Sequence, residues 1–267
     1  NTTFTCCHAI AEADLAIGTL RSILRITPTD IDARLQLASL LATKSPDEAV
    51  DNLDAVIALR PDAKELQVQK AEFLIRTGAA DKAELIAQEL VKDPKFQAVG
   101  HRVLGEAALA RRDFTTAITE LNEAQTQGVP FSSLAPLLIA SYVQAGKPEQ
   151  ANALLSDRIA KDPNDTHSMT LLAALRAQGG KPDEAEQLLR QAIATKPKDS
   201  EPYLALARLL SRQRRLKDAL KVSTNAPQPF PAARNVVLLA AVDFATSGHS
   251  DAARSGSEPI LPKWPTD

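Results

Sequence analysis

The fold is decided by residues 166–199, which read THSMTLLAALRAQGGKPDEAEQLLRQAIATKPKD. The first half places apolar side chains on one helix face, at Met169, Leu172, Ala173 and Leu175. Gly179-Gly180 and Lys181-Pro182 then break the helical pattern. The second half opens with two acids and repeats the apolar pattern at Ala185, Leu188, Leu189, Ala192 and Ile193. It stops at Pro197, so these 34 residues predict two helices joined by a tight turn.

This unit recurs along the chain, because three kinds of residue return at its period. Alanines are spaced by 33 residues once and by 34 residues six times, at Ala16, Ala49, Ala83, Ala117, Ala151, Ala185, Ala219 and Ala253. Five positions before them stand Gly78, Gly146, Gly180 and Gly248, with Arg112 and Arg214 at the two intervening places. Prolines follow at Pro28, Pro61, Pro94, Pro130, Pro163 and Pro197. A small residue lets the two helices approach, glycine suits a left-handed turn, and proline ends the second helix.

The unit resembles the tetratricopeptide repeat, whose pattern is W-x2-L-G-x2-Y…A-x3-F…P. The matching positions are Met169, Leu172, Ala173, Ala185, Leu189 and Pro197. Met169 replaces the tryptophan and Arg176 replaces the tyrosine of that pattern. Ankyrin repeats have a similar length, but their T-P-L-H-x-A signature is absent. The resemblance, to an alanine-rich bacterial type of the family, implies an all-α, right-handed superhelical solenoid of antiparallel helix pairs.

The periodicity also sets the expected domain bounds. We expect a disordered N-terminus over 1–7, a single solenoid over 8–254 and a proline-rich tail over 255–267. Within the solenoid we expect a partial repeat 8–30, repeats 31–63, 64–97, 98–131, 132–165, 166–199 and 200–231, and a partial repeat 232–254. The first helix matches the second half of a repeat, and the chain begins with Asn1 rather than methionine. We therefore expect a piece of a longer array, in which the array ends or the tail offer a route to self-association.

Composition argues against several classes of function. Apolar residues make up 44% of the chain and aromatic residues only 4%, so the core must be thin and aliphatic. A net charge of −2 gives no general attraction to nucleic acid, and no apolar run reaches the ~18 residues of a membrane span. Cys6 and Cys7 are adjacent and form no disulfide framework. The four histidines lie in separate repeats without zinc-ligand spacing, and no nucleophile or phosphate-binding motif occurs. We expect neither an enzyme nor a protein with a metal or cofactor.

The resemblance also implies where a partner binds. In the family, the second, fifth, ninth, twelfth and thirteenth positions of each repeat line a concave groove. Carried over to this sequence, these positions give the candidate site Glu72, Arg102, Glu106, Ala140, Val143, Thr170, Ala174, Ala177, Leu204, Arg208, Arg212 and Leu238. The N-terminal part is mixed and rather acidic, whereas the C-terminal part is small and apolar. We expect a protein or peptide partner, bound as a helix or extended segment, with Arg208 and Arg212 facing its acidic residues.

The sequence does not decide whether these residues form a binding surface or have a structural role. The small residues also suit close packing of successive helices, and the basic run that includes Arg208 and Arg212 also suits a solvated turn. The basic-and-asparagine clamp by which chaperone-binding members hold a C-terminal carboxylate is not matched. No aromatic residue lies within the basic run, which argues against single-stranded nucleic acid as a partner.

A weaker resemblance concerns cellular context. HRVLGEAALARRDFTTAITEL and GVPFSSLAPLLIASYVQAGKPEQA are similar to alanine-rich repeats of bacterial envelope proteins for exopolysaccharide export and secretion assembly. That resemblance implies a bacterial periplasm or cell envelope in preference to the cytoplasm. The expected function is an interaction scaffold. The alternatives are a non-catalytic accessory or regulatory module of a larger enzyme, and a solenoid that handles lipid or glycan.

The alanine period yields a stability prediction. We expect Ala185→Leu to overpack the contact between the two helices of its repeat and to destabilise the protein by about 1–3 kcal/mol. Gln178→Leu, on the outer or groove side of the first helix, is the matched control and should cost little. Chemical denaturation measures both, and equal stability of Ala185→Leu and wild type would contradict the assigned phase.

Overall fold

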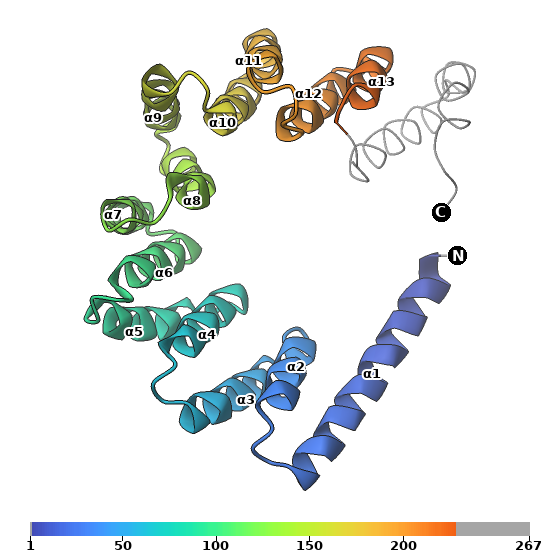
Figure 1. The fold of residues 1–267 in the computed structure, drawn as a ribbon, viewed down its shortest axis with the longest axis vertical. Helices are drawn as coiled ribbons and strands as arrows, with labels where there is room; N and C mark the ends of the chain where they lie inside the picture. Colours follow the sequence, from blue (N-terminus) through green and yellow to red (C-terminus); the bar gives the residue numbers. More distant parts are fainter. Residues whose placement is uncertain (1, 228–267) are drawn as a thin grey trace. The chain divides into compact units, whose positions relative to one another are not determined.

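The computed structural model describes residues 2–227, with side chains from residue 12 onward, and in this part of the chain it contains thirteen helices and no strand (Figure 1). The helices are α1 Thr2–Ile26, α2 Ile31–Leu41, α3 Pro46–Leu59, α4 Lys64–Arg76, α5 Ala80–Val91, α6 Gln97–Ala110, α7 Phe114–Thr126, α8 Phe131–Gln144, α9 Pro148–Lys161, α10 Thr166–Gln178, α11 Pro182–Thr195, α12 Glu201–Arg212 and α13 Leu216–Thr224. The predicted all-α solenoid of helix pairs is thereby confirmed.

The chain forms two compact units, Asn1–Lys147 and Pro148–Asp267, whereas the sequence predicts one continuous array. The boundary falls in the turn of the predicted repeat 132–165, so α8 belongs to the first unit and α9 to the second. Helix α1 begins at Thr2, although the sequence predicts disorder up to residue 7. The expected partial repeat 232–254 and the tail 255–267 lie outside the described residues.

Small residues fill the closest helix contacts. Six alanines of the periodic series are buried at the start of the second helix of their pairs, namely Ala49, Ala83, Ala117, Ala151, Ala185 and Ala219. Gly105 shows how near neighbouring helices come, because a Cβ atom there would lie 2.6 Å from Cγ of Leu121. A side chain larger than hydrogen fits at that point only if Leu121 of α7 moves.

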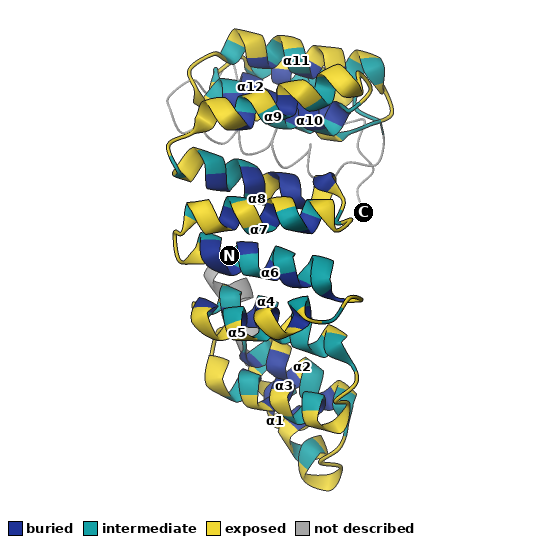
Figure 2. Ribbon diagram, turned by 90° about the vertical axis from the view of Figure 1, so that its left-hand side faces the viewer, coloured by how far each residue is buried: buried dark blue, intermediate teal, exposed yellow. Residues whose placement is uncertain are grey.

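The core is a series of small, mainly aliphatic clusters, each shared by neighbouring helices. Buried positions recur along the helices (Figure 2). In the first unit, one cluster joins α1, α2 and α3 with Phe73 of α4, and another joins α4, α5 and α6. In the second unit, a cluster joins α10 to α13 through residues such as Ala185, Leu206 and Leu210. Each repeat therefore buries apolar surface both between its own two helices and against the neighbouring repeats.

The turns between the two helices of each repeat explain why glycine recurs five positions before the periodic alanines. At Gly180 the backbone takes a φ of +76°, its N–H donates to the carbonyl of Ala177, and the next N–H donates to the carbonyl of Arg176. This pair of bonds is the Schellman motif, which satisfies the last carbonyls of a helix. Arg112 and Arg214 adopt the same left-handed conformation at φ of 66° and 61°. The turn geometry is thus kept even where the sequence lacks glycine.

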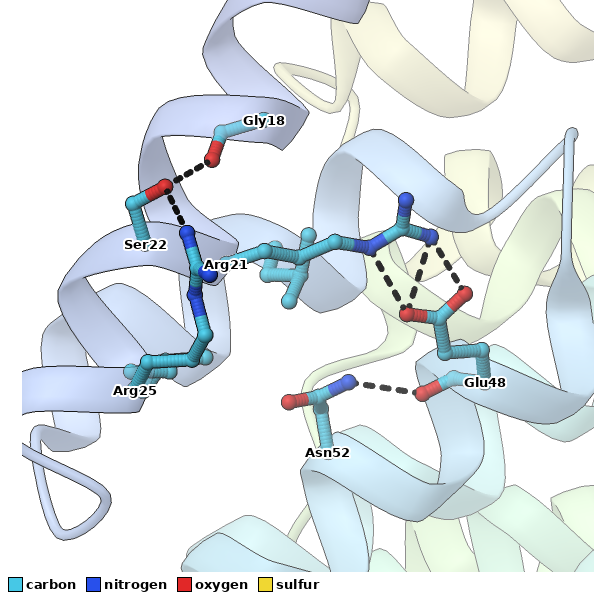
Figure 3. A pocket seen from close by; sticks show the side chains of 8 residues that line it. Gly18, Arg21, Ser22, Arg25, Glu48 and Asn52 are labelled. Carbon is cyan, nitrogen blue, oxygen red and sulfur yellow. Dashed lines mark hydrogen bonds and ion pairs between the residues drawn. The ribbon is translucent and has the colours of Figure 1, made fainter.

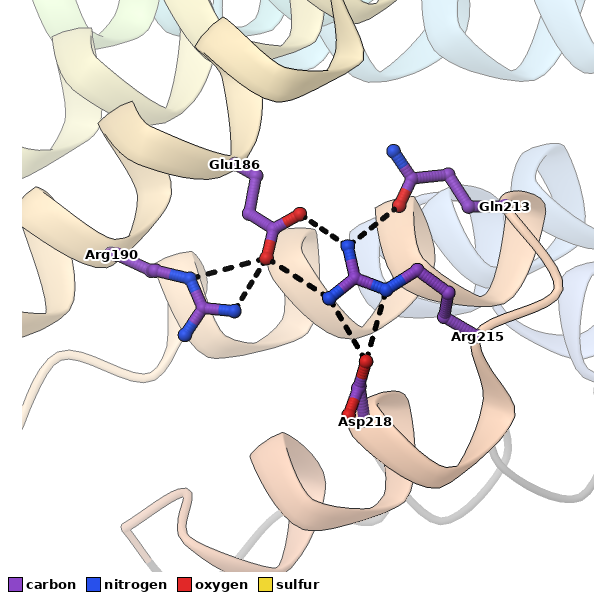
Figure 4. Close-up of polar contacts among 5 residues, drawn as sticks. All are labelled: Glu186, Arg190, Gln213, Arg215 and Asp218. Carbon is purple, nitrogen blue, oxygen red and sulfur yellow. Dashed lines mark hydrogen bonds and ion pairs between the residues drawn. The ribbon is translucent and has the colours of Figure 1, made fainter.

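Ion pairs join successive repeats at their surfaces. In the second unit, Arg215 Nη1 lies 2.6 Å from Glu186 Oε2, and Arg215 also pairs with Asp218 (Figure 4). Arg190 reaches the same Glu186 carboxylate from one turn further along α11. The hydrogen bonds from Arg190 and Arg215 lower the pKa of Glu186. These charges hold neighbouring helices together and are already satisfied.

The turn geometry predicts opposite effects at two adjacent glycines. We expect Gly180→Ala to destabilise the protein by about 1 kcal/mol, because an L-residue there must adopt the left-handed conformation. Gly179→Ala is the matched control and should be neutral or slightly stabilising, since Gly179 has a φ of −77°. Arg112→Gly should stabilise for the same reason that Gly180→Ala destabilises. Urea unfolding of the three variants tests this, and equal effects at residues 179 and 180 would contradict it.

Candidate functional site

A groove of about 300 Å³ lies in the second unit between α10 and α12, the first helices of two successive repeats. Six of the predicted site residues line it: Thr170, Ala174 and Ala177 from α10, and Leu204, Arg208 and Arg212 from α12. They come together because residues three or four apart share one face of a helix, and the repeat period places the same faces side by side. The structure therefore gathers half of the predicted set in one place.

The middle of the groove is apolar and shallow. Ala174 is exposed, while Ala177 and Leu204 are half-buried, so methyl groups and a leucine remain accessible. Thr170 is buried and donates its hydroxyl to the carbonyl of Thr166 at 2.9 Å, so it offers mainly its methyl group. Such a surface favours contact with another apolar side chain rather than with a polar ligand.

The two ends of the groove differ in charge. Arg208 and Arg212 are exposed, and neither has an ion-pair or hydrogen-bond partner among the described residues. Glu201 lines the groove at the start of α12, and its carboxylate lies 3.0 Å from Nδ1 of His167. Positions 201 and 212 are separated by ~16 Å of helix. An uncompensated positive end thus faces an acidic end that already has a partner.

The predicted residues of the first unit have a different environment. Arg102 of α6 bridges Glu72 of α4, at 2.5 Å between Nη2 and Oε1, and Glu106 one turn along its own helix. Ala140 is half-buried and Val143 is exposed on α8. None of these five residues lines the groove between α10 and α12. Because Glu72, Arg102 and Glu106 satisfy one another, they join repeats and have little capacity left for a partner.

The groove also contains residues outside the predicted site. Glu201 and Gln178 also line it, and both occupy positions that the family pattern assigns to the groove, the second and the thirteenth of their repeats. Applying the pattern fully would have included them. Leu171 and Ala205 occupy other positions, and nothing in the pattern marks them. Leu238 lies outside the described residues.

The described residues include no group of three or more histidine, cysteine or acidic side chains that could hold a metal ion. No helix among them is long and apolar enough to cross a membrane. The groove offers apolar contact, the hydrogen-bond donors of two guanidinium groups, the side-chain amide of Gln178 and the carboxylate of Glu201.

The environments of Glu106 and Glu186 predict opposite effects of removing their charges. Burial raises the pKa of Glu106, although Arg102 acts in the other direction. Folding therefore stabilises the protonated form, and the wild type loses stability as the pH rises from the ordinary to the raised pKa. We expect Glu106→Gln to be modestly more stable than wild type at pH 7. This gain in stability should be absent at pH values below the ordinary pKa of a glutamate.

Glu186→Gln is the matched variant, and we expect it to lower the unfolding free energy at neutral pH, whereas Glu106→Gln should raise it. The pKa of Glu186 is lowered, so its contribution is present at neutral pH and is lost as the pH falls through the lowered pKa. We expect a loss of up to about 1 kcal/mol at pH 7 that vanishes in acid. Unfolding free energies measured from pH 3 to pH 7 test both variants, and changes of the same sign would contradict the assigned environments.

Comparisons with known proteins bear on this arrangement. A family model described as tetratricopeptide repeat matches residues 40–107 and 175–241, and a second model with the same description matches 138–200. A search of curated proteins found no match.

Among solved structures, yeast Tom70 is 15% identical, covers 95% of this chain and 55% of its own, and has a TM-score of 0.61. A tetratricopeptide repeat protein from Parabacteroides merdae is 11% identical, covers 87% and 93%, and has a TM-score of 0.54. A thermophilic TPR protein from Thermus thermophilus is 22% identical, covers 67% and 98%, and has a TM-score of 0.48. The first two of these structures support the fold and nothing beyond it. Because the family models match more than half of its residues, the chain belongs to the tetratricopeptide repeat family.

Proposed function

We propose that this protein is a non-catalytic scaffold that binds a segment of a partner protein in the groove between α10 and α12. Tetratricopeptide repeat proteins bind protein partners and generally carry no catalytic machinery of their own. No enzyme family is indicated by the comparisons. The observation that carries the proposal is the set of six lining residues, which combine apolar side chains with two arginines that have no partner within residues 2–227.

The apolar middle of the groove favours a partner helix or extended strip with apolar side chains. Ala174 and Ala177 occupy little space, so the partner backbone can come close to α10. Packing of α10 against α12 alone would bury these methyl groups, but Ala174 remains exposed. This is the helix-in-groove or extended-segment mode by which proteins recognise short peptides.

The basic end of the groove favours acidic residues beside that strip. Arg208 and Arg212 have no counter-charge among the described residues, so a carboxylate of the partner gains ion pairs without breaking existing ones. Complementary charge acts strongly on the association rate and on the choice of partner. The bacterial envelope setting, with a role in polysaccharide export or secretion assembly, stays a prediction from the alanine-rich sequence phrases.

A charge-reversal experiment tests this function. Random 15-residue peptides displayed on phage are selected on the wild type and on the double variant Arg208→Glu/Arg212→Glu. We expect wild-type binders to carry an apolar strip next to Asp or Glu, and binders of the double variant to carry Lys or Arg there. An acidic binder should lose about tenfold or more in affinity on the double variant, because like charges then face each other.

Two control variants test whether the effect depends on charge within the groove and whether the groove is the binding site. Lys217→Glu/Lys221→Glu makes the same charge change on exposed α13 residues outside the groove and should select the same peptides as the wild type. Ala174→Arg fills the groove from an exposed position and should abolish binding while leaving the fold intact. If a folded Ala174→Arg variant retains the selected peptides, the groove is not the site.

A further inference from the structure

A second cavity, of about 610 Å³, lies in the first unit between α1 and α3, far along the sequence from the groove residues (Figure 3). The buried Leu37 of α2 and the half-buried Leu24 of α1 contribute apolar lining. Apart from Leu37, the cavity is lined by α1 and α3, which are second helices of repeats, whereas the groove in the second unit lies between the first helices α10 and α12.

One face of α1 lines this cleft. Gly18, Ser22 and Arg25 follow one another at spacings of four and three residues, so they share one helix face, and all three line the cavity. A Cβ atom at Gly18 would meet no other atom within 4 Å. Gly18 is thus not required for helix packing, and the space beside it is free.

Fixed polar groups border the cleft. Arg21 reaches from α1 to Glu48 of α3 and donates to both of its carboxylate oxygens, at 2.7 Å for the shortest contact (Figure 3). Asn52 of α3 donates its side-chain amide to the backbone carbonyl of Glu48 at 2.8 Å. The contact of Arg21 with Glu48 ties the two walls together and neutralises the only carboxylate of the lining, whereas the Asn52 bond stays within α3.

One lining cation remains without a counter-charge. Arg25 donates from Nη2 to the hydroxyl of Ser22 at 3.0 Å and pairs with no carboxylate among the described residues. Behind Asn52, the half-buried Arg34 donates only to neutral oxygens, those of Pro28 and of the Asn52 side chain. With Arg21 and Glu48 cancelling each other, the cleft is positive. The exposed guanidinium of Arg25 can donate its N–H groups to an anion.

We propose that the cleft between α1 and α3 binds a small organic anion, whose carboxylate or phosphate group pairs with Arg25 and whose apolar body lies against Leu24 and Leu37. The guanidinium supplies a planar set of donors to the anionic group. The leucines offer an apolar contact that an organic anion can make and an inorganic anion cannot. This site is separate from the protein-binding groove.

The probes for this site are phenyl phosphate, benzoate, inorganic phosphate and sodium chloride at matched ionic strength. Protein labelled with ¹⁵N-arginine reports binding through the Nε–H resonances. We expect phenyl phosphate or benzoate to shift the Arg25 resonance in a saturable manner, with at least several-fold tighter binding than inorganic phosphate. The better of the two organic probes identifies the anionic group. An equal response to sodium chloride would mean simple screening and would overturn the proposal.

Three variants make the test specific. Arg25→Gln should lower the affinity about tenfold, whereas Arg60→Gln, at an exposed arginine outside the cavity, should leave it unchanged. Gly18→Phe should fold, because open space surrounds that position, and should abolish binding by filling the cleft, as followed through the remaining arginine resonances. Unchanged affinity in either Arg25→Gln or folded Gly18→Phe would overturn the proposal.

Discussion

Close contact between helices through buried alanines is the constraint on which the rest of this structure depends. A repeat of two short helices cannot bury its own apolar face, so it must lie tightly against the next. Alanines such as Ala117, Ala151 and Ala185 have no exposed surface and occupy the same place in successive repeats. This explains how a chain with so few aromatic residues forms a core. Many small contacts replace the few large side chains of an ordinary globular domain.

The same constraint positions the candidate site. When repeats stack at a constant period, equivalent residues of their first helices come to lie in rows, and the side chains of a row decide what binds. Paired charges such as Glu186 with Arg215, or Arg102 with Glu72, connect one repeat to the next. Arg208 and Arg212 have no such pairing among the described residues. Comparing paired with unpaired charges therefore separates residues that hold the array together from those available to a partner.

The sequence predicted the periodic features and missed those that depend on contacts across repeats. Helix α10 begins at Thr166, where the repeat was placed, and α11 ends at Thr195, just before Pro197. Arg112 was assigned to a glycine position by phase alone and does take a positive φ. By contrast, residues 2–7 are helical although they lack an apolar period.

The pairing of Arg102 with Glu72 could not be predicted either, because its two residues are 30 positions apart and no local pattern reports such contacts. For the same reason, the division into two units and the cavity beside Gly18 emerge only from the folded chain. The spacing of residues along the sequence predicts where helices begin and end. Whether a side chain packs, pairs or remains accessible depends on the residues of other repeats that it contacts.

The most direct measurement for the binding groove is site-specific photo-crosslinking in the cells that make this protein. A benzoylphenylalanine is placed at Ala174, inside the groove, or at Gln187, an exposed residue of α11 outside it. The account predicts crosslinks from position 174 to one polypeptide, mapped to an apolar segment beside Asp or Glu residues, and none to that polypeptide from position 187. Crosslinks to the same partner from position 187 alone would show that the groove between α10 and α12 does not bind it.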